Sequence, residues 1–108
     1  MSTIALKQFD TARAIEQTLA IDGTPINLTG CEVRINWYNL LSGAMWQRDA
    51  EIVDEDAGTV TYTPVAEDVE TAGDFEIEWE ILYPDNSRLT VPTEGRVPTT
   101  INPAIVPA

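Results

Sequence analysis

Three glutamates, Glu76, Glu78 and Glu80, alternate with apolar residues and are the first candidates for chemistry in this chain. On a β-strand their side chains would share one face, about 6–7 Å from one to the next. Two carboxylates can hydrolyse a glycosidic bond, but this requires a cleft and a raised pKa on one of them. An open sheet face offers neither, so we expect no catalysis at this position. Instead we expect Arg34, on a neighbouring strand, to offset the repulsion among the three charges.

A second acidic group is the run Asp54, Glu55 and Asp56, with Asp68 and Glu70 further along the chain. Carboxylate oxygens are the ligands that calcium prefers, and calcium takes six to eight of them. The run lacks the ordered spacing of an EF-hand loop, and acidic turns of this kind are usually solvated. We therefore expect a solvated turn here and no metal site.

The chain has no histidine and a single cysteine, Cys31. Without histidine it lacks the usual general base, the imidazole metal ligand and the group that activates a serine or cysteine nucleophile. Its glycines stand apart at turns and form no phosphate-binding loop. These features predict a protein that is not an enzyme and has no cofactor. A lone cysteine forms no internal disulfide, which favours folding in a reducing cytoplasm, and we expect Cys31 to be a small buried residue at the start of a strand.

The charge of the chain is strongly unbalanced, since 18 acidic residues against 6 basic ones give a net charge of −12 at pH 7. Such a surface repels nucleic-acid phosphates and anionic membranes, so we expect neither as a partner. The charge favours solubility, and it also suits capture by a larger basic partner. No leader segment and no membrane-spanning stretch is recognisable in the sequence.

The glutamates belong to the clearest structural pattern in the sequence, which runs from residue 71 to 95. Apolar residues alternate there with acidic ones, as expected for a strand with one buried and one exposed face. The Pro-Asp-Asn-Ser sequence at 84–87 then reverses the chain into 88–91, which predicts a hairpin. A second alternating strand is expected at 31–38. The inward positions of these two strands form the expected core: Val33, Ile35, Trp37, Phe75, Ile77, Trp79 and Ile81. We expect Trp37 and Trp79 to face each other across that core from the two central strands.

The remaining segments are typical of short strands and turns within one domain. We expect strands at 4–9, 12–21, 44–47, 51–53, 59–63 and 95–101, the first two of these being two strands or one bent strand. Residues 64–72 predict a single helical turn that crosses between sheets, capped by Thr63 and ended by Gly73. Seven or eight short antiparallel strands with one helical turn predict an all-β, immunoglobulin-like β-sandwich. We expect the sandwich to occupy residues 1–101, followed by an extended proline-rich tail at 102–108.

Several short motifs follow one another along this pattern of strands and turns. They are Asp22-Gly23-Thr24-Pro25, Leu28 with Gly30, the Val33–Ile35–Trp37 strand, Val53-Asp54, Gly58-Thr59-Val60-Thr61-Tyr62, Asp68, Ala72-Gly73-Asp74-Phe75, Glu78-Trp79-Glu80, and Thr90-Val91-Pro92 with Gly95. In this order, from about residue 12 to 101, the chain resembles the N-terminal domain of the phage baseplate upper protein family, an immunoglobulin-like module of tailed-phage virions. Members of that family usually continue into long spacer and receptor-binding regions. We therefore expect this chain to be either an excised domain or a small free-standing virion protein.

The resemblance implies a non-enzymatic structural protein of the virion, synthesised in the host cytoplasm. Its partners would be other virion proteins of the capsid, tail or baseplate, met through its loops, edge strand or termini. A baseplate or tail adaptor and a capsid decoration both remain open, as does a symmetric homo-oligomer within the assembly. The alternative is a carbohydrate-binding module for host surface glycans, which would use exposed aromatic residues beside amide groups: Trp46, Tyr38 and Tyr83 with Asn36 or Asn39. A third hypothesis, a bacterial cell-surface repeat, is disfavoured because no secretion signal and no internal repeat is recognisable.

Overall fold

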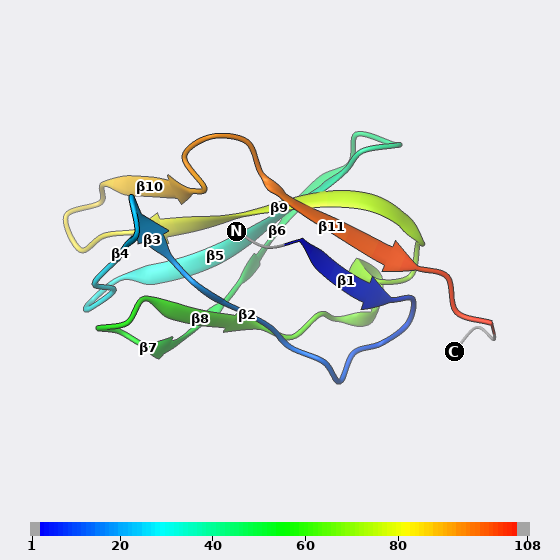
Figure 1. Ribbon diagram of the computed structural model, residues 1–108, viewed down its shortest axis with the longest axis horizontal. Helices are drawn as coiled ribbons and strands as arrows, with labels where there is room; N and C mark the ends of the chain where they lie inside the picture. Colours follow the sequence, from blue (N-terminus) through cyan, green and yellow to red (C-terminus); the bar gives the residue numbers. More distant parts are fainter. Residues whose placement is uncertain (1–2, 106–108) are drawn as a thin grey trace.

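The alternating segment around Trp79 forms the longest strand, β9 (Gly73–Leu82), in the computed structural model, which describes residues 3–105. Strand β5 (Glu32–Asn39) pairs antiparallel with one side of β9 along most of its length. The other side of β9 is shared, since β11 (Val97–Asn102) pairs with its first half and β10 (Arg88–Val91) with its second half. Strand β9 is therefore the centre of the larger sheet (Figure 1).

Two further strands complete this six-stranded sheet at its edges. Strand β6 (Met45–Asp49) pairs antiparallel with β5, and β1 (Ile4–Lys7) pairs parallel with β11. The smaller sheet contains β2 (Ile15–Thr18), β8 (Thr59–Tyr62) and β7 (Glu51–Asp54) in that spatial order. Because a single residue separates β6 from β7, the chain passes from one sheet to the other almost directly.

A two-residue hairpin joins β3 (Ala20–Ile21) to β4 (Thr24–Pro25). Its turn residues, Asp22 and Gly23, both have positive φ, at 51° and 81°. Asp-Gly in this conformation matches the twist of antiparallel strands, which explains why the dipeptide is a strong turn signal. The Asp22-Gly23 motif of the sequence therefore forms a tight turn.

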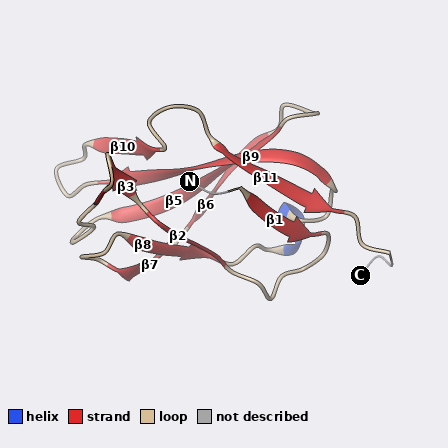
Figure 2. Cartoon of the chain, viewed as in Figure 1, coloured by secondary structure: helices blue, strands red, loops and turns tan. Residues whose placement is uncertain are grey.

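The all-β sandwich predicted from the sequence is confirmed, with differences in detail (Figure 2). The described residues form eleven strands rather than seven or eight, because the segment from residue 4 to 25 divides into four short ones. The pairing of β1 with β11 is parallel, whereas antiparallel strands were expected throughout. This pair joins residues almost a whole chain length apart, and no local pattern indicates its direction.

The expected helical turn is present as a 3₁₀ turn, η1 (Ala66–Asp68), between β8 and β9. Its expected limits were wrong. Val65, not Thr63, precedes the turn, and Gly73 already belongs to β9. The physical reason is that the Asp68 carboxylate accepts the backbone N–H of Val65 at 3.0 Å, so the turn is closed by its own last residue. No helix in the part of the chain from residue 3 to 105 is long and apolar enough to cross a membrane.

The core lies between the two sheets. All seven residues expected there are at most 3% exposed. The two tryptophans do not face each other across it, however, because β5 and β9 are neighbours in one sheet. Trp37 lies opposite Ile77 and Trp79 opposite Ile35, so the two rings point the same way. Trp37 instead stacks on Trp46 at a centroid distance of 5.8 Å, with the ring planes 6° apart.

Candidate functional site

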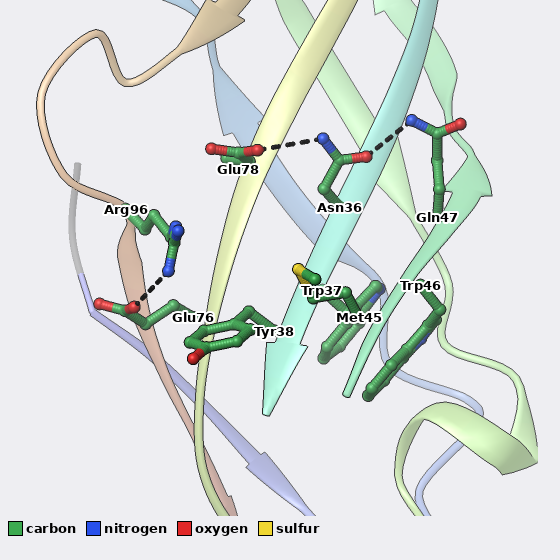
Figure 3. Close-up of a pocket in the computed structure, with 9 residues that line it drawn as sticks. All are labelled: Asn36, Trp37, Tyr38, Met45, Trp46, Gln47, Glu76, Glu78 and Arg96. Atoms are coloured by element: carbon green, nitrogen blue, oxygen red, sulfur yellow. Dashed lines mark hydrogen bonds and ion pairs between the residues drawn. The ribbon is translucent and has the colours of Figure 1, made fainter. Parts of the chain in front are cut away.

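The three glutamates of β9 share the outer face of the larger sheet, and each has its own partner. Figure 3 shows Glu76 and Glu78 with theirs. Glu76 forms an ion pair with Arg96 at 3.2 Å, and Glu78 accepts a hydrogen bond from the amide of Asn36 at 3.2 Å. Glu80 lies 3.8 Å from the guanidinium of Arg88. These contacts offset the repulsion among the three negative charges on one face of β9.

Arg34 does not have the role that the sequence suggested. It lies opposite Glu80 in the register of β5 and β9, as expected. Its guanidinium, however, is 3.6 Å from Asp49 on β6 and 4.0 Å from Glu32 on its own strand. The prediction was wrong because a second partner strand supplies competing carboxylates, while Arg88 on β10 approaches Glu80 from the other side.

A shallow depression of about 360 Å³ lies on this outer face, over β5, β6 and β9. In it the guanidinium of Arg96 lies 4.7 Å from the centroid of the Tyr38 ring, a cation–π contact, while also pairing with Glu76. Asn36 bridges the depression, because it donates to Glu78 and accepts from Gln47 at 2.8 Å. The site therefore presents carboxylates and amides beside an aromatic ring, which suits a cationic or polar group of a ligand.

The two aromatic residues expected to contact a glycan or a partner are both engaged within the protein. Arg96 covers one face of Tyr38. Trp46 is half-buried, stacks on Trp37 and donates its indole N–H to Asp68 at 2.7 Å. Neither ring offers two free faces to a sugar.

The other glycan candidates also have local roles. The side-chain oxygen of Asn39 accepts the backbone N–H groups of Leu41 and Ser42, at 2.9 and 3.2 Å, and so shapes a turn. Tyr83 is half-buried and packs against the core. Burial raises the pKa of the Tyr83 hydroxyl, with smaller contributions from Cys31 and Asp85.

Within residues 3–105, the most heavily hydrogen-bonded carboxylate is that of Asp68, for which the sequence suggested a solvated acidic residue and a motif position but no structural role. Asp68 is 1% exposed. One of its oxygens accepts from Trp46 and from Arg48, at 2.7 and 3.2 Å. The other accepts from the Tyr62 hydroxyl and from the backbone of Val65. Because Trp46 and Arg48 lie on the larger sheet and Tyr62 on the smaller one, this carboxylate connects the two sheets.

The electrostatics of this cluster follow from its burial. Burial raises the pKa of Tyr62 well above its ordinary value, and the hydrogen bond to Asp68 raises it further. The same carboxylate raises the pKa of Arg48 through its hydrogen bond. One sequence signal was available, since Asp68 follows Val65 by the three residues at which a carboxylate can cap a turn. Nothing local identifies the donors on β6 and β8.

The acidic run forms the exposed end of β7 and the start of the turn that leads to β8. Asp54, Glu55 and Asp56 are all exposed, and Asp54 accepts the backbone N–H of Ala57 at 3.1 Å. No group of three or more acidic, histidine or cysteine residues within residues 3–105 is arranged to hold a metal ion. Cys31 precedes β5 and is half-buried rather than fully buried. Burial and, to a smaller extent, Glu55 raise the pKa of its thiol, which makes it a poor nucleophile.

Comparison with known protein families assigns the chain. The family model of the BppU (baseplate upper protein) N-terminal domain matches residues 2–95. The chain belongs to this family. The resemblance inferred from the order of turns and strands is thereby confirmed, and membership indicates a structural protein of a phage baseplate, located in the virion, with other virion proteins as partners.

This BppU N-terminal domain also has a counterpart among solved structures. The crystal structure of CopC from Methylosinus trichosporium OB3b superposes with a TM-score of 0.58 and covers 100% of this chain and 91% of that chain. Sequence identity is 10%, so the likeness shows a shared fold alone. No curated protein matches the chain.

One feature of this BppU N-terminal domain was missed from its sequence: an apolar tip on the hairpin between β5 and β6. Leu41 is 96% exposed, Met45 75% and Leu40 49%. Two leucines directly before the Ser42-Gly43 turn were a signal, because large apolar residues are rarely placed at a solvated turn without a reason.

Proposed function

We propose that this domain is a non-enzymatic docking module of a phage baseplate, which attaches to a larger neighbour through an exposed loop. The observation that carries the proposal is the family match over residues 2–95. It favours the baseplate or tail adaptor over the capsid decoration. Its synthesis in the host cytoplasm agrees with the half-buried, unpaired Cys31.

The arrangement of side chains supports a structural role rather than catalysis. The glutamates of β9 are each held by a partner on an open sheet face, and Asp68 is occupied by four donors from the protein. None of these carboxylates is placed beside a nucleophile in a cleft.

A density map of the particle whose genome encodes this chain, obtained by electron cryomicroscopy, tests the proposal. We expect the domain at the baseplate. Density on the capsid lattice would instead assign it to decoration, and its absence from the whole particle would refute a virion role.

Carbohydrate binding, the alternative, has less support because Tyr38 and Trp46 are already engaged. It predicts a change in tryptophan fluorescence when host surface glycans are added, with the strongest effect on Trp46. Unchanged fluorescence together with a silent glycan array would remove this alternative.

A further inference from the structure

Three of the exposed large apolar side chains among residues 3–105 belong to the hairpin between β5 and β6. Leu40, Leu41 and Met45, which we call the hairpin tip, are 49%, 96% and 75% exposed. Figure 1 shows the hairpin projecting beyond the body of the sandwich. Soluble domains seldom gather large apolar side chains on an exposed projection unless another molecule covers them.

Hydrogen bonds hold the hairpin tip in one shape. The side chain of Asn39 accepts the backbone N–H groups of Leu41 and Ser42, and the Asn39 carbonyl accepts that of Gly43 at 2.8 Å. The N–H of Leu40 donates to the carbonyl of Asp74 at the start of β9, at 3.2 Å. The exposure of Leu41 is therefore built into the loop, and binding would order little additional chain.

Acidic depressions flank the hairpin on both sides. The first is the 360 Å³ depression of the outer face, which Met45 also lines and where Glu76 and Glu78 outnumber the single cation, Arg96. The second, of about 460 Å³, lies beside β6 and η1. It is lined by the hairpin residues Asn39, Ser42 and Ala44, and by three carboxylates against one guanidinium: Glu67, Asp68, Glu70 and Arg48.

One cation of the domain itself, the guanidinium of Arg96, already lies in the first depression. Arg96 lies over the ring of Tyr38 and pairs with Glu76. Within residues 3–105, Glu78 forms no ion pair and is bound only by the neutral amide of Asn36. A lysine or arginine from another molecule can therefore pair with Glu78 in the depression that Met45 also lines.

We infer that the hairpin tip and the two acidic depressions form the surface by which this domain docks, an inference that rests on the proposed function. The partner is a protein surface with an apolar pocket for Leu41 and Met45, edged by lysine or arginine residues that face Glu78 and Glu67. Charge complementarity selects this occupant. A second copy of the chain carries the same net charge of −12 and would be repelled, as would nucleic acid.

The test measures binding of the purified, labelled full chain to baseplates from particles assembled without it. We expect Leu41→Ser to weaken binding about tenfold or more, as for a central interface residue. Val53→Ser is the matched control, because Val53 is 56% exposed on β7, away from the hairpin, and should bind like the wild type. Thermal unfolding of Leu41→Ser should be unchanged, since the side chain is 96% exposed.

The charge component is tested with Glu78→Gln, for which we expect weaker binding and a shallower dependence on salt. Glu51→Gln, an exposed change on β7, serves as its control. If the wild-type chain does not bind the baseplates, the proposed function fails. If the wild type binds and Leu41→Ser binds equally well, the function stands and the docking surface is wrong. If Leu41→Ser weakens binding but Glu78→Gln leaves the salt dependence unaltered, the basic character of the partner is refuted.

Discussion

Replacing Asp68 with asparagine tests whether one buried carboxylate holds the two sheets of the sandwich together. Asparagine keeps the shape of the side chain but turns one acceptor oxygen into an NH₂ donor. In the best arrangement the remaining oxygen still accepts from Trp46 and Arg48. The new amide nitrogen then faces the Tyr62 hydroxyl and the backbone N–H of Val65.

The cost follows from what each of these partners can do. The Tyr62 hydroxyl can rotate and accept from the amide, whereas the Val65 N–H cannot and loses its partner. An unsatisfied buried donor costs about 1–3 kcal/mol, and the lower half of that range applies because Val65 is 45% exposed. Loss of the negative charge facing Arg48 adds about 1 kcal/mol, a reduced value since that side chain is 33% exposed. We expect the free energy of unfolding to fall by about 2–3 kcal/mol.

Urea unfolding followed by far-ultraviolet circular dichroism is the appropriate assay, because Trp46 fluorescence would respond to the substitution itself. With a urea m-value of about 1–3 kcal/mol/M, the midpoint should fall by roughly 0.7–3 M. Glu67→Gln is the matched control. Its carboxylate lies 3.5 Å from the same guanidinium of Arg48 but is 80% exposed, so its loss should change stability by less than about 0.5 kcal/mol. Equal urea midpoints for the two variants would refute the argument that Asp68, through its burial and its four donors, stabilises the packing of the two sheets.

Three further outcomes are expected. Gly58→Ala should lower the free energy of unfolding by about 2–4 kcal/mol, because φ is +71° and the new Cβ would lie 2.7 Å from a backbone carbonyl oxygen. Gly43→Ala, at φ +77° in open space, should lower it by only about 1 kcal/mol. A larger loss of stability for Gly43→Ala than for Gly58→Ala in urea unfolding would contradict this reasoning. The raised pKa of Tyr62 favours the protonated phenol in the folded state, so its stabilising effect is complete below about pH 10 and is lost at higher pH. Urea midpoints measured between about pH 8 and pH 11 should therefore fall less steeply for Tyr62→Phe than for the wild type. Burial and Glu55 raise the pKa of the Cys31 thiol. At mildly alkaline pH the thiol should therefore react with a disulfide reagent more slowly in the folded protein than in urea. Equal reaction rates in the two states would show that the fold does not protect Cys31.

The strands were the predictable part of this fold. The alternation in β5 and β9 depends only on one face being buried and the other solvated, so it can be recognised from consecutive residues of the sequence. The same alternation says nothing about which sheet a strand joins. For that reason Trp37 and Trp79 were expected to face each other across the core, whereas they project from neighbouring strands of one sheet.

The contacts of the candidate site depend on long-range pairing and were only partly predictable. Glu76 and Glu80 were placed on the right face, but their partners, Arg96 and Arg88, come from segments whose register is set by pairing with β9. The contacts of Asp68 were even less predictable from the sequence. Its donors come from positions 46, 48, 62 and 65, which only the folded sandwich brings together.

The apolar hairpin tip also bears on how many copies of the domain act together. Burying Leu41 and Met45 fully, with the exposed half of Leu40, would contribute roughly 4–7 kcal/mol. Association costs about 4–15 kcal/mol in lost translational and rotational freedom, so this tip alone supports only weak attachment of a single copy. Pairing of Glu78 and Glu67 with basic residues of the partner adds to the attraction. Stable attachment would then require several copies that are linked to one another, because only linked copies raise each other's effective concentration at a symmetric assembly. A single copy, whose charge of −12 opposes self-association, would be held only weakly, so the strength of attachment depends on such a link.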